Sequence, residues 1–530
     1  RNGDNETLSI HRLVQVVLRD EMQADAQRLW AERAIKAVCR VFPASEMRSW
    51  QQCQRYLPHA LLAAALIQQQ HLSFPEAAQL LYLAACYLYD LASYAEASKL
   101  CEQALAIVEQ VYGEEHAETA RTLHCLANIC ESQGLSTRAL SLYQRALAIA
   151  ERTWGPEHAD TARLLNDLGE HFQEAERFAR AEEYYRRAFA IREQIFGLKH
   201  PDTASSLNNI AGICEEQSHY EQAAEWYERA LQVRLHLRGP HHVETAESLS
   251  NVARFYRVVG KYQQAEPLYE QAIVAYQQAL GPQHPRVATC YNNFAVFCIV
   301  VGRYAQAEQW LSQALDIRTQ LFGLQHRRTA ESWNHLARVY YKQGRYEQAQ
   351  ALYQQALTIC EERLGRDHSS TRAILINMSE LYLAQGNDQL AEGLLTEVLT
   401  AITAGQETRP LDAAPVLNLL GEVYLARGQY ERAEQVLTEA LAIRQERLGK
   451  THPETAMSLK SLGDLALARD EDAQAAEWYQ QALELVLEPL GPSHPEVITL
   501  ADRLVNLLQK MGRAEEAQTL AERVHTQPSP

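Results

Sequence analysis

The sequence of 530 residues lacks several features that mark common functional classes. It has no apolar run of about 18 residues and no signal-peptide pattern at its start, so we expect no membrane span and a cytoplasmic location. Its formal net charge of −17 argues against nucleic acid or an anionic membrane as the main partner. The chain is too long for one ordinary core, which predicts several domains or an elongated array.

Patterns typical of catalytic and metal centres are also missing. The ten cysteines form no C-x-x-C pair and no zinc spacing, and Cys214, Cys290 and Cys298 are predicted to be small buried side chains. The GKT sequence at 449–451 is similar to the end of a phosphate-binding loop, but Arg444 stands where that loop needs its first glycine. We therefore expect no catalytic residue, no metal site and no cofactor, and a chain that is not an enzyme.

What the sequence does have is an internal period of about 42 residues. Glycines recur at this spacing, with one double step: Gly113, Gly155, Gly197, Gly239, Gly281, Gly323, Gly365, Gly449 and Gly491. A histidine stands three positions after each of them, from His116 to His494. The skipped copy has Glu407 and Pro410 at these two positions, so its frame is kept and the copy is degenerate rather than inserted.

Inside each copy the apolar spacing is helical. Apolar residues between 207 and 214 follow an i, i+3, i+4, i+7 pattern, and a second set follows between 223 and 230. Each copy is thus predicted to be a helix, a tight turn, a longer helix and a G-x-x-H loop. One phase is alanine in all eleven copies, from Ala97 through Ala223 to Ala517, which predicts a close helix contact. A tyrosine phase that includes Tyr227 is expected to wedge between neighbouring pairs.

The recurrent histidines are interpreted as architecture, because a catalytic histidine usually occurs once. His200 precedes Pro201, which suits a first helical turn. The ring is expected to pack on the preceding helix and to form a hydrogen bond within the loop. Asp202 and Thr203 are expected to satisfy free backbone N–H groups at the helix start.

These residues resemble the tetratricopeptide repeat, with Leu, Gly or Ala, and an aromatic on the first helix and Ala-x-x-x-Tyr-x-x-Ala on the second. That repeat usually has about 34 residues, and the longer period here is similar to that of kinesin light chain and of bacterial arrays of the same subtype. The resemblance covers residues 78–530, with the copy at 372–413 degenerate and the last truncated. It implies an all-α, right-handed superhelical solenoid of antiparallel helix pairs, whose first helices line a concave groove for a protein or peptide ligand.

Asparagines stand in two adjacent phases of the first helices. The first phase comprises Asn166, Asn208, Asn292, Asn334 and Asn418, and the second comprises Asn209, Asn251, Asn293 and Asn377. An amide donates and accepts, which suits an extended peptide backbone, and the resemblance to kinesin light chain implies the same use. Alternatively, the amides satisfy helix carbonyls or each other. The second phase is expected to lie nearer the repeat interface.

Arginines add a further candidate in the middle copies. Arg254, Arg257 and Arg338 are predicted to form a basic patch on the groove, which would favour an acidic peptide segment or a carboxylate. The alternative is ordinary solvated charge.

Residues 1–77 do not follow the period. The IHRLVQ sequence at 10–15, Trp30, Pro43, Trp50 and the LPHA sequence at 57–60 resemble bacterial signalling ATPases of the STAND class, which join an NB-ARC-type nucleotide domain and a winged-helix domain to a tetratricopeptide array. This resemblance implies that residues 1–22 end a winged-helix domain and that 23–77 form a helical linker or cap. It also implies an upstream nucleotide-binding domain in the same parent chain.

Two functions stay open at this point. His11 matches the histidine that senses bound nucleotide in the STAND class, although Arg12 departs from the Asp of eukaryotic relatives. The chain is then the ligand-sensing and autoinhibitory domain of an NTPase switch, with no nucleic-acid or membrane partner. The alternative is a stand-alone adaptor that holds cargo peptides, like kinesin light chain. The sequence before Arg1 would distinguish them.

The alanine phase generates a stability prediction. Ala223→Leu should lower the free energy of unfolding by about 1–3 kcal/mol, because the larger side chain overpacks a close helix contact. Thermal denaturation of the two proteins measures the effect. An unchanged melting temperature would contradict the placement of Ala223 between helices.

Overall fold

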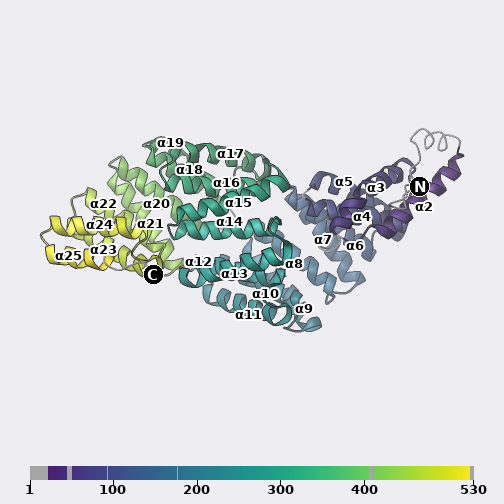
Figure 1. Ribbon diagram of the computed structural model, residues 1–530, viewed down its shortest axis with the longest axis horizontal. Coiled ribbons are helices and arrows are strands. Elements are labelled where there is room, and N and C mark those ends of the chain that lie inside the picture. The colour runs from purple at the N-terminus through teal and green to yellow at the C-terminus, as the bar shows by residue number, and fades with distance from the viewer. Residues whose placement is uncertain (1–21, 45–49, 92, 176, 405–409, 526–530) are drawn as a thin grey trace, which may run out of the picture. The chain divides into compact units, whose positions relative to one another are not determined.

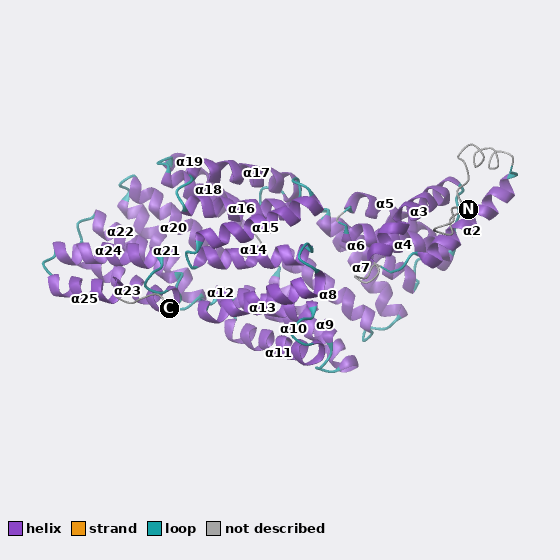
Figure 2. Cartoon of the chain, in the orientation of Figure 1, coloured by secondary structure: helices purple, strands orange, loops and turns teal. Residues whose placement is uncertain are grey.

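The computed structural model describes residues 22–44, 50–91, 93–175, 177–404 and 410–525. All regular structure in these ranges is α-helical, as Figure 2 shows. His11 and Glu407 lie outside the described residues.

Helices α2 (Ala24–Val41) and α3 (Trp50–Gln69) precede an alternation of shorter and longer helices. The first helices of the successive pairs are α4 (Pro75–Asp90), α6 (Ala117–Ser132), α8 (Ala159–Glu174), α10 (Pro201–Glu216), α12 (Val243–Val258), α14 (Pro285–Val300), α16 (Arg327–Lys342), α18 (Ser369–Ala384), α20 (Pro410–Ala426), α22 (Thr455–Ala468) and α24 (Pro495–Lys510). The second helices are α5 (Tyr94–Tyr112), α7 (Ser136–Thr153), α9 (Phe178–Phe196), α11 (Tyr220–Arg238), α13 (Tyr262–Leu280), α15 (Tyr304–Phe322), α17 (Tyr346–Leu364), α19 (Asp388–Ala404), α21 (Tyr430–Arg447), α23 (Asp472–Leu490) and α25 (Ala514–His525).

The chain forms two compact units. The first unit comprises Arg1–Ala175 with Glu183–Ile191, and the second comprises Glu176–Glu182 with Arg192–Pro530. Within the second unit each helix packs on the helix that follows it, so that antiparallel pairs stack side by side (Figure 1). The all-α array of helix pairs expected from the period is therefore confirmed.

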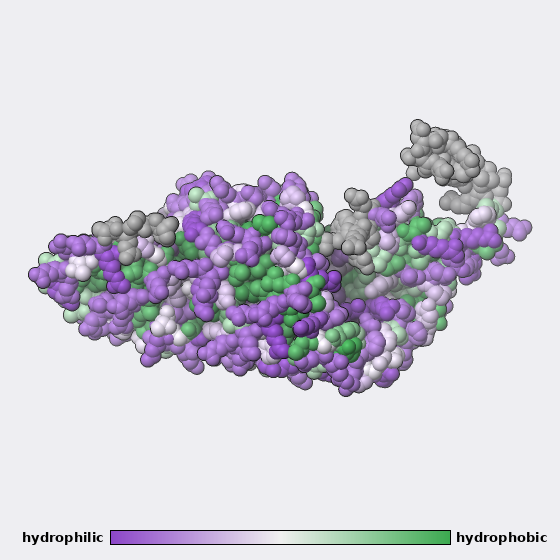
Figure 3. Space-filling view, turned by 60° about the horizontal axis from the view of Figure 1, so that its bottom comes forward, coloured by the Kyte–Doolittle hydropathy of each residue, from purple (hydrophilic) through white to green (hydrophobic). Residues whose placement is uncertain are grey.

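The alanine phase is buried in every pair. All eleven alanines, from Ala97 to Ala517, are at most 1% exposed. The tyrosine phase is equally buried, with Tyr227 only 2% exposed. The face drawn in Figure 3 is hydrophilic over much of its area and carries hydrophobic residues in its middle.

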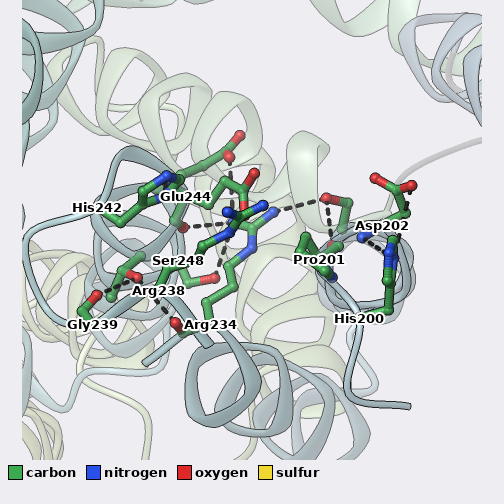
Figure 4. Close-up of polar contacts among 12 residues, drawn as sticks. His200, Pro201, Asp202, Arg234, Arg238, Gly239, His242, Glu244 and Ser248 are labelled. Atoms are coloured by element: carbon green, nitrogen blue, oxygen red, sulfur yellow. Dashed lines mark hydrogen bonds and ion pairs between the residues drawn. The ribbon is translucent and has the colours of Figure 1, made fainter. Parts of the chain in front are cut away.

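The G-x-x-H loop both ends one helix and starts the next (Figure 4). The ring of His200 stacks on Phe196 of the preceding helix, with 4.2 Å between ring centroids. Its Nδ1 accepts a hydrogen bond from the backbone N–H of Asp202 at 3.2 Å, so the histidine is the N-cap residue. Thr203 donates its hydroxyl proton to the carbonyl of Gly197 at 2.9 Å. The expected ring packing and loop hydrogen bond are confirmed. The expectation that Asp202 and Thr203 cap the N–H groups is wrong, because the histidine takes that role and the threonine satisfies a carbonyl.

Buried arginines are a feature that the sequence analysis missed. Four of them occupy one phase of the second helices and are at most 8% exposed: Arg192, Arg234, Arg318 and Arg444. Each donates from Nη1 to a serine hydroxyl 14 residues later. In Figure 4 the guanidinium of Arg234 reaches from α11 to Ser248, at 3.1 Å, and to the carbonyl of Glu244, at 2.8 Å.

The arginine and the serine change together from copy to copy. Where the phase lacks arginine, the later position lacks serine as well: Tyr276 with Cys290, Cys360 with Ile374, Ile402 with Val416, and Val486 with Leu500. All of these replacements are buried. The physical reason is that a buried charge needs acceptors, whereas a serine hydroxyl without its donor gains nothing over an apolar group. The sequence alone contains this signal, because the arginine and the serine change together at a constant spacing of 14 residues.

This pairing predicts the effect of removing one arginine. Arg318→Ala should lower the free energy of unfolding by about 2–4 kcal/mol, since it leaves a cavity and strips the carbonyl of Arg328 and the hydroxyl of Ser332 of their donor. Urea denaturation measures the loss. Arg318→Tyr combined with Ser332→Cys copies the neighbouring pair and should recover part of it. If the double variant is no more stable than Arg318→Tyr alone, the pairing is not the cause of the covariation.

Candidate ligand-binding face

The first helices of the second unit pack directly on one another. Contacts join α10 with α12, α12 with α14, α14 with α16, and α16 with α18. We call the surface formed by these five helices the first-helix face. All candidate residues from 208 to 338 lie on its helices, so their place on the helix perimeter decides which can meet a ligand.

The first-phase asparagines lie in the seams between these helices. Asn208 donates to the hydroxyl of Ser248 at 3.0 Å, and Asn292 accepts from the hydroxyl of Ser332 at 3.1 Å. Asn334 accepts from the amide of Asn377 at 3.0 Å. The four first-phase asparagines of this unit are at most 7% exposed, and Asn418 follows the same pattern by donating to Ser461 at 3.1 Å.

The expected order of the two phases is therefore reversed. The first phase lies at the repeat interface and links consecutive first helices, and of the second phase Asn377 takes part in one such link. In the first unit, Asn166 is 8% exposed and donates to Glu170 at 3.0 Å. These amides are held by the protein itself, as in the alternative that the sequence left open.

The second phase is more accessible. Asn251 on α12, Asn293 on α14 and His335 on α16 are half-buried, and within the described part of the chain their side chains make no hydrogen bond to the protein. Asn209 is half-buried and has a partner. The unpartnered side chains occupy the same position on three consecutive first helices, so they form a row.

The three candidate arginines differ in how they are held. Arg254 makes an ion pair with Glu215, and its Nη2 lies 2.9 Å from the hydroxyl of Tyr227. Burial lowers the pKa of Arg254, but the charge of Glu215 outweighs it and the pKa is raised. Arg257 lies almost one turn further along α12 and is half-buried. Arg338 makes no ion pair within the described residues, and its Nε is buried without an acceptor.

The buried tyrosines differ in whether their hydroxyl meets a hydrogen-bond acceptor. In four copies the hydroxyl of the tyrosine phase meets a side-chain acceptor of its own first helix: Tyr143 with Asn128, Tyr185 with Gln173, Tyr227 with Glu215, and Tyr479 with Asp464. The acceptor stands 15 positions before the tyrosine in the first and last of these copies, and 12 positions before it in the other two.

Two central copies depart from this arrangement. The hydroxyls of Tyr269 and Tyr353 are buried and meet no acceptor among the described residues, and the hydroxyl of Tyr269 faces the guanidinium of Arg257. At the two acceptor positions, the copy of Tyr269 has Arg254 and Arg257, and the copy of Tyr353 has Arg338 and Tyr341. This spacing was a signal that sequence reasoning could have used.

A donor thus replaces the acceptor in the two central copies, and the buried hydroxyls are left over. We give the name central donor cluster to Asn251, Asn293, His335, Arg338 and the hydroxyls of Tyr269 and Tyr353, because none of these groups meets an acceptor among the described residues. Buried polar groups without a partner are uncommon in proteins, and in adjacent copies of this array they stand beside the half-buried Asn251, Asn293 and His335.

The protonation state of His335 decides which hydrogen bonds it can offer in this cluster. Burial lowers the pKa of His335 to about 4, and the positive charge of Arg338 acts in the same direction. The ring is therefore neutral near pH 7 and presents one donor and one acceptor, as an amide does. His335 therefore stands at the same helix position as Asn251 and Asn293 and, like their amides, offers both a donor and an acceptor.

The first unit offers a contrast. There His124 contacts Asp167, and His171 meets Glu131 at 2.6 Å, so polar side chains of neighbouring first helices satisfy one another. Burial raises the pKa of Asp167, but the hydrogen bond and charge of His124 prevail and lower it. On α6 and α8, these polar groups are therefore held by internal hydrogen bonds.

One family of known proteins matches most of this chain. The profile of the family described as "Tetratricopeptide repeat" matches residues 76–152, 118–194, 160–236, 244–320, 292–362, 328–404 and 412–488, which together span well over half of the chain. The chain belongs to the tetratricopeptide repeat family. Such repeats are protein-interaction scaffolds and generally bind protein partners.

Solved structures with similar repeats include kinesin light chain relatives. A putative kinesin light chain from Podosopora anserina, with nearly identical TPR-like repeats, is 23% identical, and the match covers 39% of this chain and 97% of that chain with a TM-score of 0.33. BtubC (BKLC) from P. vanneervenii is 20% identical over 44% of this chain and 92% of that one, with a TM-score of 0.35. No curated protein sequence matches this tetratricopeptide chain.

Two further searches concern the described residues only. None of their helices is both long and apolar enough to cross a membrane. In the same ranges, no group of three His, Cys, Asp or Glu side chains is placed to hold a metal ion.

Adjacent asparagines on α14 test the assignment of the two phases. Asn292→Ala should lower the free energy of unfolding by about 1–2 kcal/mol, because it removes the acceptor of a buried hydroxyl. Asn293→Ala breaks no hydrogen bond and should change stability by less than about 0.5 kcal/mol. Chemical denaturation of both variants provides the comparison, and equal losses would contradict the assignment.

Proposed function

We propose that this chain is the ligand-sensing and autoinhibitory repeat domain of a STAND-type NTPase switch, and that it binds a protein or peptide segment on the first-helix face. The observation that carries the binding part is the central donor cluster, in which unpartnered groups stand on α12 to α17 of a tetratricopeptide array. The STAND part rests on the resemblance of residues 10–15 and 57–60, together with Trp30, Pro43 and Trp50.

The cluster suits an extended segment that carries negative charge. Asn251, Asn293 and the neutral ring of His335 each offer a donor and an acceptor, which matches the alternating N–H and C=O groups of a peptide backbone. Arg338 has no ion pair of its own among the described residues and would supply the charge-assisted contact to a carboxylate. Arg254 is already neutralised by Glu215, so we assign it a positioning role.

This assignment narrows the candidates that the sequence offered. Asn208, Asn292, Asn334 and Asn418 hold the repeats together, and a ligand reaches them only by displacing their partners. Asn209, Asn293, Arg257 and Arg338 remain ligand candidates on the face. Asn251 and His335 join them because of their place in the row.

In the proposed switch, the ligand acts by preferring one spacing of the first helices. A segment that spans α12, α14 and α16 binds best when these helices hold one spacing, so binding shifts the array toward that spacing. The array would pass the change through α2 and α3 toward the upstream nucleotide-binding domain, where His11 is the proposed sensor. An adaptor would bind the same segment without altering nucleotide exchange.

The binding proposal is tested by replacing three groups at once. A chain with Asn251→Ala, Asn293→Ala and Arg338→Ala should lose at least about tenfold in affinity for peptides that co-purify with the wild type, since it loses two backbone contacts and a charged one. Mass spectrometry identifies the peptides, and fluorescence anisotropy of synthetic copies measures the affinity.

The matched control changes two amides and one arginine on exposed parts of second helices. Gln263→Ala, Gln264→Ala and Arg363→Ala should leave binding unchanged. Equal binding by the cluster variant and this control would refute the first-helix face as the site. Nucleotide exchange in the parent protein then separates the two functions, because a switch responds to the bound peptide and an adaptor does not.

A further inference from the structure

Two loops of the second unit touch turns that lie 194 residues earlier in the chain. His452, in the loop before α22, has its Nε2 2.7 Å from the carbonyl oxygen of Val258, the last residue of α12. His494, in the loop before α24, has its Nε2 2.9 Å from the carbonyl oxygen of Val300, the last residue of α14. The spacing lies between four and five repeats, so one turn of the array closes on the next, and it does so identically in two successive copies.

The hydrogen-bond partners determine the tautomer of both rings. In each ring Nδ1 accepts from a backbone N–H, of Glu454 or Glu496, at 3.1 Å. Nε2 must then carry the proton and donate it to the carbonyl of the distant turn. Within the residues that the structure describes, His242 and His284 make the same cap bond without a distant carbonyl, so the second bond sets the later copies apart from them.

The turn opposite each histidine is shaped for this contact. A Cβ at Gly260 would lie 2.8 Å from Cδ of Pro453, and one at Gly302 would lie 2.7 Å from Cδ of Pro495. Gly344 and Gly386 occupy the same kind of turn, with φ of +76° and +73°, and a Cβ there would meet no described atom within 4 Å. The proline ring therefore packs directly on a turn that has no side chain.

Charged groups surround both contacts. Glu454 and Arg444 act on His452, while Glu496 and Lys342 act on His494. Burial lowers the pKa of both rings, and in each case it prevails over the nearby glutamate. On the facing turns, the hydroxyl groups of Tyr220, Tyr262 and Tyr304 lie near these glutamates and stay protonated, because burial raises the pKa of all three.

We propose that the loops at His452 and His494 form a clasp that holds one turn of the array closed, and that protonation of these two histidines opens it. A second proton can enter only at Nδ1, which then turns from acceptor to donor and faces the backbone N–H that it capped. The cation must leave the contact to regain water. The distant carbonyls of α12 and α14 are thereby released.

The direction of the pH dependence follows from the lowered pKa values. Both rings are neutral in the closed state, so the clasp contributes its full stability above the ordinary histidine pKa of about 6.5. That contribution is lost as the pH falls through this value toward the lowered pKa of the closed state. The helices released, α12 and α14, carry Asn251 and Asn293, although the clasp itself does not depend on any ligand.

Hydrogen exchange of the full chain measures the clasp locally. After correction for the intrinsic pH dependence of exchange, peptides that cover 258–264 and 300–306 should lose about tenfold in protection between about pH 7.5 and about pH 5. Peptides that cover the unclasped turn at 342–348 should not change. Constant protection at 258–264 and 300–306 would overturn the role of protonation.

Histidine variants separate the distant bond from the cap. Asparagine keeps an N-cap acceptor but is too short to reach the distant carbonyl. His452→Asn with His494→Asn should therefore show the low protection at both pH values, and its pH dependence should vanish. The control, His242→Asn with His284→Asn, should behave as the wild type. If the two double variants are indistinguishable, the distant bonds do not form a clasp.

Glycine variants test the packing without changing any titratable group. Gly260→Ala with Gly302→Ala should open the clasp at the higher pH, because the new Cβ atoms collide with the two prolines. Gly344→Ala with Gly386→Ala imposes the same backbone strain without a collision, and the clasp should stay closed. Equal protection of 258–264 in both glycine variants would overturn the proposal, even if the histidine variants fail to fold.

Discussion

The array depends on the imidazole ring of the histidine in each G-x-x-H loop, which lies between two consecutive helices. In each well-formed copy, a glycine with positive φ follows the second helix, and three positions later a histidine accepts the backbone N–H of the second residue of the next helix. The same cap recurs at each junction between helix pairs, so one local hydrogen bond helps to define how consecutive pairs of the array join. Because Nδ1 is used for the cap, Nε2 always points away from it as a donor, and two copies use that donor to hold a distant turn.

The seams between repeats follow a second rule, which is that the Nη1 of each buried arginine meets a serine hydroxyl 14 residues later. Serine joins a buried arginine of the second helix to an asparagine of the preceding first helix, as Ser248 and Ser332 do. Copies without the arginine also lack the serine, as Cys360 with Ile374 and Val486 with Leu500 show. Two sets of buried groups meet no acceptor among the described residues: the hydroxyls of Tyr269 and Tyr353 in the central copies, and the Nε atoms of Arg234, Arg318, Arg338 and Arg444 along the array.

Much of the fold followed from periodicity alone, whereas the candidate site followed only in part. The repeat phase placed Ala223 at a close contact and His200 in a loop, because local packing and capping depend on near neighbours in the chain. The same reasoning ranked Asn208 above Asn209 as a ligand contact, and Asn208 proved to be buried in a seam. Adjacent residues on a helix differ by about 100° in direction, so the position of the neighbouring helix decides which of them is covered.

The sequence by itself determined the repeating unit: the length of its helices, the turn that joins them, and the side chains that pack within a pair. It also showed that the copies of Tyr269 and Tyr353 lack an acceptor at the two positions where other copies have one. Only the tertiary structure decided which asparagines remain accessible and which loops meet distant turns of the array. The physical reason is that the approach of one turn to the next accumulates from small rotations at every repeat interface. No single repeat specifies that sum.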